Sequence, residues 1–264
     1  MRPTLSLSRT RGRRGGFIPQ QLSAVSGLLS LAASPQSGGE WTSWVDIISG
    51  NNGAINSARR PAVAAAANGL PLAAFLTNDA VAWPIAASNF NRDTWGIFLD
   101  AKPTGVASTQ ILWCISNGNT NGADHRAIVT FFSLTDWIID VYATDANGRR
   151  FIVPLGAAAG VSRRYGIEYD SGAGGDANVY PTINGVVQST VKSNLGAGAT
   201  LGQLQVCTGN LLIGNFNDGA ASSALTGSTG PNVVSLTSKL AGASSGQLLT
   251  ADGRTRLVGY QVPA

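Results

Sequence analysis

Two carboxylates lie close together in the stretch RYGIEYD, residues 164–170, and a glycine-rich break follows them. In an extended strand alternate side chains share a face, so Glu168 and Asp170 are neighbours on one face while two tyrosines and an isoleucine form the other, core-facing side. Two carboxyl groups about 5–5.5 Å apart are the arrangement of retaining glycosidases. One hypothesis is therefore a polysaccharide-degrading enzyme that uses Glu168 with Asp170 or with Glu40.

A structural role for both carboxylates is the interpretation that we favour. Asp170 leads directly into SGAGGD, where a carboxylate starts a turn by accepting backbone N–H bonds. Glu168 is expected to be a solvated residue on the outer face of the strand. We therefore assign no catalytic residue and expect a protein that is not an enzyme.

Other residue types that carry chemistry are scarce in this chain. His125 is the only histidine, so a zinc site of ordinary composition is hard to build. It follows Asp124 in a loop rich in Asn and Gly, and an exposed loop histidine is the interpretation that we favour over a Ser–His–Asp arrangement. Phosphate-binding GxxxxGK[ST] and strand-linked GxGxxG motifs are missing. We expect neither a cofactor nor a metal.

The two cysteines, Cys114 and Cys207, have no CxxC spacing, which favours two buried free thiols. One long-range disulfide between them is the alternative.

Two groups of residues are candidates for contact with a glycan. The segment LLIGNFNDGA places Asn215, Asn217 and Asp218 directly after an expected strand, where their oxygens could meet calcium or sugar hydroxyls. A turn with asparagines in left-handed conformation is the interpretation that we favour for them. The six tryptophans are Trp41, Trp44, Trp83, Trp95, Trp113 and Trp137. We expect them to fill the core, with Trp83 and Trp137 as the candidates for a sugar-stacking platform.

The composition predicts a packed, turn-rich, all-β protein. Hydrophobic residues make up 44% of the 264 residues and charged residues 12%, with 33 glycines and 11 prolines. Short β-rich runs recur between glycine and asparagine clusters, at 95–101, 110–116, 127–133, 137–144, 150–155, 164–170, 178–183, 204–207 and 210–216. This spacing indicates an antiparallel sandwich or barrel. We further expect a short helix near Val233 to Leu240 and a closing strand in RLVGYQV, residues 256–262.

The positive charge is concentrated at the start of the chain. Of the 18 basic residues five lie within the first fourteen positions, which leaves 13 basic against 14 acidic residues in the remainder. We therefore expect a flexible basic arm over residues 1–20, a near-neutral single domain over 21–264, and no face for nucleic acid. No run of eighteen apolar residues exists, and the first residues lack the apolar stretch of a secretory signal, so we expect neither membrane insertion nor export by that route.

A series of short motifs extends over most of the chain. The front motif W-x-D-x-x-S-G-N-x-x-A is formed by Trp44, Asp46, Ser49, Gly50, Asn51 and Ala54. Arg60-Pro61, Asn68-Gly69-Leu70-Pro71, Phe75, WGIF at 95–98, RYGIEYDSG, YPTINGVVQS and LLIGNF follow it. In this order the motifs resemble the concanavalin A-like or laminin-G-like jelly-roll domains of bacteriophage structural proteins. Two features depart from that family. FLTNDA, residues 75–80, leaves Asp79 as the only carboxylate in a loop that usually reads F-x-G-x-D-D, and the part after Ser222 matches no family pattern.

The resemblance implies an antiparallel jelly-roll β-sandwich in a structural protein of the phage virion, displayed on the particle surface and assembled in the host cytoplasm. The leader TLSLSRTRGRRGG is similar to leaders that dock such domains into the particle, so Arg9, Arg11, Arg13 and Arg14 are expected to form a virion-docking arm. The implied role is adhesion to the host surface as a tail fibre or receptor-binding protein, with head decoration as the alternative. Expected partners are other virion proteins, further copies of the same chain, and a host-surface glycan. Among assemblies of the chain with itself, a trimer would suit a fibre or a decoration knob.

Overall fold

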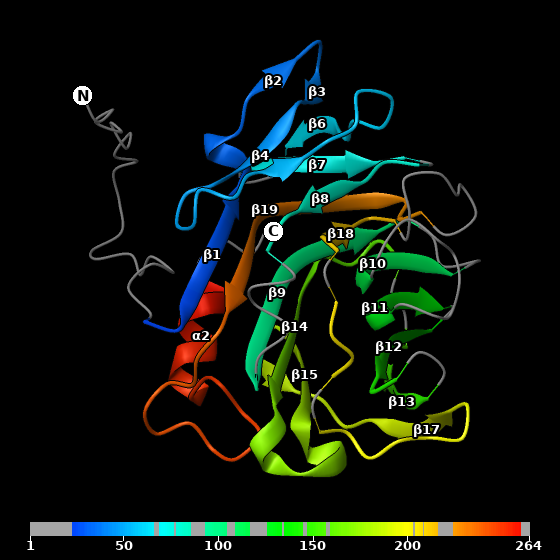
Figure 1. Ribbon diagram of the computed structural model, residues 1–264. Helices are drawn as coiled ribbons and strands as arrows, with labels where there is room; N and C mark the ends of the chain where they lie inside the picture. The colour runs from blue at the N-terminus through cyan, green and yellow to red at the C-terminus, as the bar shows by residue number, and fades with distance from the viewer. Residues whose placement is uncertain are drawn as a thin grey trace.

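The computed structural model is dominated by antiparallel strands, which confirms the expected all-β sandwich (Figure 1). It describes residues 23–65, 69–76, 78–85, 93–104, 109–116, 126–133, 135–144, 147–156, 159–202, 204–207, 209–215 and 224–259. The expected docking arm, with Arg9, Arg11, Arg13 and Arg14, lies outside the described residues, as does His125.

The first sheet has a long central strand, β19 (Gly227–Leu236), with partners on both sides. On one side the order is β9 (Thr94–Pro103), β14 (Arg163–Asp170), β15 (Val179–Ile183) and β16 (Val186–Val187). On the other side β19 pairs with β1 (Val25–Ser30) and β7 (Pro71–Phe75), and β7 continues to β6 (Ala62–Ala65), β3 (Glu40–Trp41) and β2 (Gln36–Ser37).

The second sheet lies against the first and is joined to it by one shared strand. Its order is β17 (Val191–Leu195), β13 (Gly148–Pro154), β12 (Asp136–Tyr142), β11 (Arg126–Ser133), β10 (Gln110–Ser116), β18 (Leu211–Ile213), β8 (Val81–Trp83), β5 (Gly53–Ala54) and β4 (Ser43–Asp46). The last two residues of β4 pair with β1 of the first sheet, so β4 carries the chain from one layer to the other.

The core between the sheets is rich in aromatic side chains. All six tryptophans are buried, as expected, and most of the remaining core consists of branched aliphatic residues on alternate positions of the strands. The Trp95 and Tyr169 rings stack at 5.1 Å between centroids, and Tyr165 meets Phe132 and Trp137 edge-on. The Tyr165 contacts tie the two layers together, because β14 belongs to the first sheet and β11 and β12 belong to the second. The Trp95–Tyr169 stack joins neighbouring strands of the first sheet.

Most of the predicted strands form where the alternation of side chains and the turn residues place them. The Asn184-Gly185 turn between β15 and β16 has both residues at positive φ, 51° and 80°, which is the backbone that an Asn-Gly hairpin favours. The predicted strand at 204–207 is wrong, because these residues form no described strand.

Two predictions for the C-terminal part are wrong. Val233 to Leu240 does not form a helix, because β19 extends to Leu236 and is held between β9 and β1. Residues 256–262 were expected as a strand, but the helix α2 (Ala251–Gly259) includes the first of them. The Thr250 hydroxyl accepts a hydrogen bond from the Gly253 N–H at 3.0 Å, so Thr250 caps the first turn of this helix.

The segment that ends in α2 covers the outer face of the first sheet, meaning the face turned away from the second sheet. Leu248, Leu249 and Leu257 pack there against Leu28 of β1 and Phe98 of β9. Three short 3₁₀ turns, η2 (Leu31–Ala33), η4 (Ser171–Ala173) and η5 (Gly175–Asn178), complete the described helices. None of the described helices is long and apolar enough to span a membrane.

Candidate functional site

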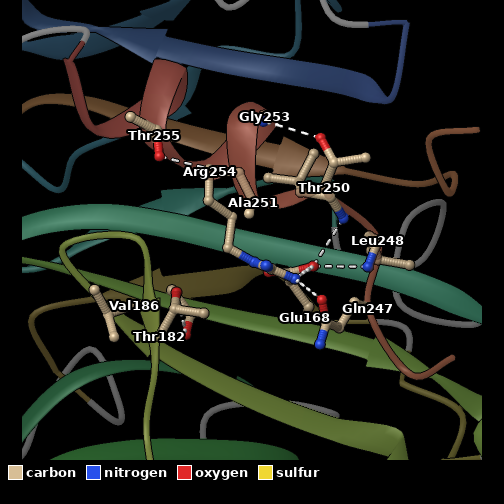
Figure 2. Close-up of polar contacts among 12 residues, drawn as sticks. Glu168, Thr182, Val186, Gln247, Leu248, Thr250, Ala251, Gly253, Arg254 and Thr255 are labelled. Carbon is tan, nitrogen blue, oxygen red and sulfur yellow. Dashed lines mark hydrogen bonds and ion pairs between the residues drawn. The ribbon is translucent and has the colours of Figure 1, made fainter. Parts of the chain in front are cut away.

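Glu168 is buried, which corrects the expectation of a solvated residue on the outer face. The face of β14 that carries it is covered by the C-terminal segment, and the side chain has no exposed surface. Its Oε2 accepts hydrogen bonds from the backbone N–H groups of Leu248 at 2.6 Å and Leu249 at 2.9 Å (Figure 2). Arg254 of α2 forms an ion pair with the same carboxylate and donates to Gln247 Oε1 at 2.6 Å.

The carboxylates of the glycosidase hypothesis are all engaged in structural contacts. Asp170 accepts from the Gly172 N–H at 3.1 Å and from Lys239 Nζ at 3.0 Å, so its predicted turn-starting role is confirmed. Glu40 lies on β3, which pairs with β2 and β6 and not with β14, and its closest cation is Arg60 at 3.9 Å. Among the residues that the structure describes, Glu168 therefore has no accessible carboxylate partner.

A second buried ion pair lies on the same covered face. Arg164 on β14 and Asp100 on β9 are register partners, and the Arg164 Nε and Asp100 Oδ1 atoms are 2.7 Å apart. Arg164 also donates to the Leu257 carbonyl of α2. Burial raises the pKa of the Asp100 carboxyl above its ordinary value, and the positive charge of Arg164 opposes that shift. Both ion pairs thus hold α2 on the first sheet.

The front motif of the sequence has a structural purpose. The Asp46 carboxylate accepts hydrogen bonds from the N–H groups of Leu28, Ile48 and Ser49 at 2.9–3.1 Å, and from the Ser49 hydroxyl. The Trp83 indole N–H donates to the same carboxylate at 3.1 Å. Asp46 therefore joins β1, β4 and β8 at the strand that the two sheets share.

The three candidate glycan contacts that the structure describes are all buried. Trp83 and Trp137 are both completely buried, so neither ring presents a face on which a sugar could stack. Asn215 is buried as well, next to the end of β18, while Asn217 and Asp218 lie outside the described residues.

Asp79, the remaining carboxylate of the family's loop, is part of a turn. It is buried, and its Oδ2 accepts from the Leu76 N–H at 2.7 Å. Burial raises the pKa of the Asp79 carboxyl, which the Leu76 hydrogen bond partly offsets. Within the described ranges, no three His, Cys, Asp or Glu side chains are grouped to hold a metal ion, and Cys114 and Cys207 are buried free thiols, as expected.

A pocket that the sequence analysis missed lies on the outer face of the second sheet. Its volume is about 280 Å³. It is lined by Ala54, Ile55, Asn56, Arg59, Ala80, Ala82 and Leu212. Ala54, Ala82 and Leu212 are register partners across the neighbouring strands β5, β8 and β18. The hollow forms because two of these three adjoining positions carry small alanine side chains, and Leu212 supplies an apolar wall.

The loop after β5 places a charged side chain beside this apolar floor. Asn56 forms the turn: its side-chain oxygen accepts from the Ala58 N–H at 3.0 Å and its carbonyl accepts from the Arg59 N–H at 2.9 Å. Arg59 follows and lines the pocket. One apolar floor, one amide and one guanidinium give this pocket a lining of mixed character. The sequence signal for it was weak, because it consists of alanines from separate strands and a single arginine.

Known structures share the fold over most of the chain. Neither a family model nor a curated protein matches the sequence. A sialidase of Trypanosoma rangeli in complex with sialic acid is similar over 90% of this chain and 33% of its own, at 13% identity and a TM-score of 0.56. The receptor-binding domain of botulinum neurotoxin type G is similar over 89% of this chain and 51% of its own, at 12% identity and a TM-score of 0.52. The chain thus spans a third of the sialidase and half of the toxin domain, and the likeness concerns the β-sandwich fold alone.

Proposed function

We propose that this chain is a non-enzymatic glycan-binding module and that the pocket on the outer face of the second sheet is its binding site. The observation that carries the proposal is the pocket's lining: the apolar floor of Ala54, Ala82 and Leu212 lies beside the polar groups of Asn56 and Arg59. A sugar ring has the matching character, with C–H groups on its faces and hydroxyls at its edge. The volume of about 280 Å³ is near the lower end of the ~300–1,000 Å³ typical of ligand pockets, which suits one sugar residue.

The structural neighbours support this class of function. One was solved with sialic acid bound, and another is a receptor-binding domain of a toxin. Fold likeness by itself does not assign function, so the proposal depends on the pocket.

The carboxylates support binding without catalysis. Glycoside hydrolysis needs two carboxyl groups that reach the scissile bond, whereas Glu168 is enclosed under α2 and Asp170 is held by Gly172 and Lys239. If the rival enzyme hypothesis is correct, Glu168→Gln abolishes release of sugar from host envelope material and leaves binding intact. We expect no release from either form of the protein.

A glycan array with pocket variants tests the binding proposal. Ala54 lines the pocket and is exposed, so Ala54→Leu fills the site without disturbing the core, and Ala82→Leu fills it from the next strand. Ala65→Leu is the matched control, because Ala65 is an exposed strand residue outside the pocket. We expect both pocket variants to lose binding by at least about tenfold and the control to bind normally. Equal binding by all four proteins would reject the pocket as the site.

We further propose that the module acts on the surface of a bacteriophage particle, as a tail fibre or receptor-binding protein anchored by its first residues. The support is the order of family-like motifs and the arginine-rich leader. Deletion of residues 1–16 should give a folded protein that no longer enters particles. Immunogold electron microscopy with antibody against residues 90–264 distinguishes the locations: label at the tail tip supports host recognition, label over the head indicates decoration, and unlabelled particles contradict the virion role.

A further inference from the structure

Arg59 differs from the other arginines at the surface of the pocket region in having no acidic partner among the described residues. Its Nη1 atom is buried and has no hydrogen-bond partner there. The adjoining Arg60 also has a buried nitrogen without a hydrogen-bond partner, Nε, but its charge faces Glu40 at 3.9 Å. Arg150 on the same outer face forms a two-pronged pair with Asp140 at 2.7 Å for both contacts. Arg59 is half-buried, and an Nη1 N–H that lacks an acceptor is unfavourable, so the guanidinium can gain from an anion bound in the pocket.

The surroundings of Arg59 limit which anion fits. The other lining residues are uncharged, and five of them are apolar, so the pocket carries a single positive charge. Polyphosphates and nucleic acids are held by several basic groups together, whereas one planar guanidinium matches one carboxylate through two parallel hydrogen bonds. The Asn56 turn fixes the backbone of Arg59, which favours a defined orientation of the bound group.

We infer that the pocket takes a sugar residue that carries a carboxylate, such as a uronic acid or a sialic acid, and that Arg59 binds the carboxylate. The inference rests on the proposed glycan-binding function and specifies its ligand class. The apolar floor then contacts the ring, and Asn56 lies at the rim, where it can meet a hydroxyl.

Calorimetric titration with matched acidic and neutral sugars tests this inference. Glucuronic acid and glucose differ only in the carboxyl group, and sialyllactose and lactose differ by the sialic acid residue, so the two pairs also distinguish the two sources of carboxylate. We expect one acidic sugar to bind at least about tenfold more tightly than its neutral partner. Arg59→Gln should weaken that binding by about 10- to 100-fold, the range for a lost charged hydrogen bond, and Arg59→Lys by less.

Arg60→Gln is the matched control, because it removes the same charge from the adjoining residue, which does not line the pocket. Normal binding by this variant supports a specific role for Arg59, while an equal loss in both variants overturns it in favour of general charge attraction. If neutral sugars bind as tightly as acidic ones and Arg59→Gln has no effect, the inference fails and the glycan-binding proposal stands. If neither these sugars nor any glycan of the array binds, the proposal and the inference fail together.

Discussion

Glu168 and Arg254 are 86 residues apart in the sequence and form a buried ion pair. The pair connects the middle of the first sheet to the last described helix. Arg254 also reaches Gln247, so the carboxylate, the guanidinium and the amide form one connected cluster beneath the C-terminal segment (Figure 2). Glu168 thus acts as the attachment point of that segment.

Breaking this pair should destabilise the protein strongly. Glu168→Gln leaves the Arg254 charge buried without a counterion, and loss of one partner of a buried pair costs about 3–5 kcal/mol. Asp252→Asn is the control, because the Arg256–Asp252 pair on the same helix is exposed and is expected to contribute about 0–1 kcal/mol. Urea unfolding measures both changes. Similar losses in the two variants would contradict the attachment role.

Asp46 should be as important for stability as any residue of the core. Asp46→Ala leaves the Leu28 N–H and the Trp83 indole N–H buried without their acceptor, and each unsatisfied group costs about 1–3 kcal/mol. We expect the free energy of unfolding to fall by more than about 3 kcal/mol, measured by urea denaturation. Asp93→Ala, at an exposed carboxylate, should change it by less than about 1 kcal/mol. A mild effect at Asp46 would show that its hydrogen bonds are readily replaced by water.

The two cysteines should be unreactive in the folded protein. Cys114 and Cys207 are both completely buried thiols that form no disulfide, so a thiol reagent cannot reach either sulfur. Titration with a thiol reagent, in the absence of reductant, should detect no thiol in the native protein and both thiols after unfolding. Absence of thiols in the unfolded, unreduced chain would reveal a disulfide and contradict the arrangement described.

Stability should decline in alkaline solution because of a buried tyrosine. Burial raises the pKa of Tyr169 from 10.0 to about 12, and burial also raises the pKa of Tyr165. The folded protein therefore holds these protons more tightly than the unfolded chain does. The contribution of Tyr169 is complete below pH 10 and is lost as the pH rises through about 12.

Tyr169→Phe tests this pH dependence. Each such tyrosine contributes a slope of up to about 1.4 kcal/mol per pH unit between its unfolded and folded pKa values. Urea unfolding at several values above pH 10 should show a shallower decline in the variant than in the parent protein. Parallel curves for the two proteins would mean that Tyr169 titrates normally.

The strands could be predicted because their signals are local. Alternating side chains and the Asn184-Gly185 turn are sufficient to predict β14, β15 and β16. The turn that Asp170 starts could be predicted as well, because glycines follow this carboxylate directly. The burial of Glu168 could not be predicted in the same way. Alternation indicates which face a side chain occupies, but whether that face is covered depends on a segment about 80 residues later.

The C-terminal helix and the pocket were missed for different reasons. For α2 a signal existed, since Thr250 caps the helix and Asp252 and Arg256 are spaced as a helical ion pair, but the apolar run after Arg256 has the character of a strand. The pocket has no local signal at all. It arises because the pairing of β5, β8 and β18 brings Ala54 and Ala82 next to each other.

The position of a bound glycan tests the central claim most directly. The protein is labelled at its alanine methyl groups and titrated with the oligosaccharide that binds most tightly on the array. Chemical-shift changes in the NMR spectra then report which methyl groups lie at the contact site. We predict the largest shifts for the methyls of Ala54, Ala80 and Ala82, which line the pocket beside Arg59. Shifts that concentrate on other alanines while these three stay unchanged would contradict the assignment of this pocket as the binding site.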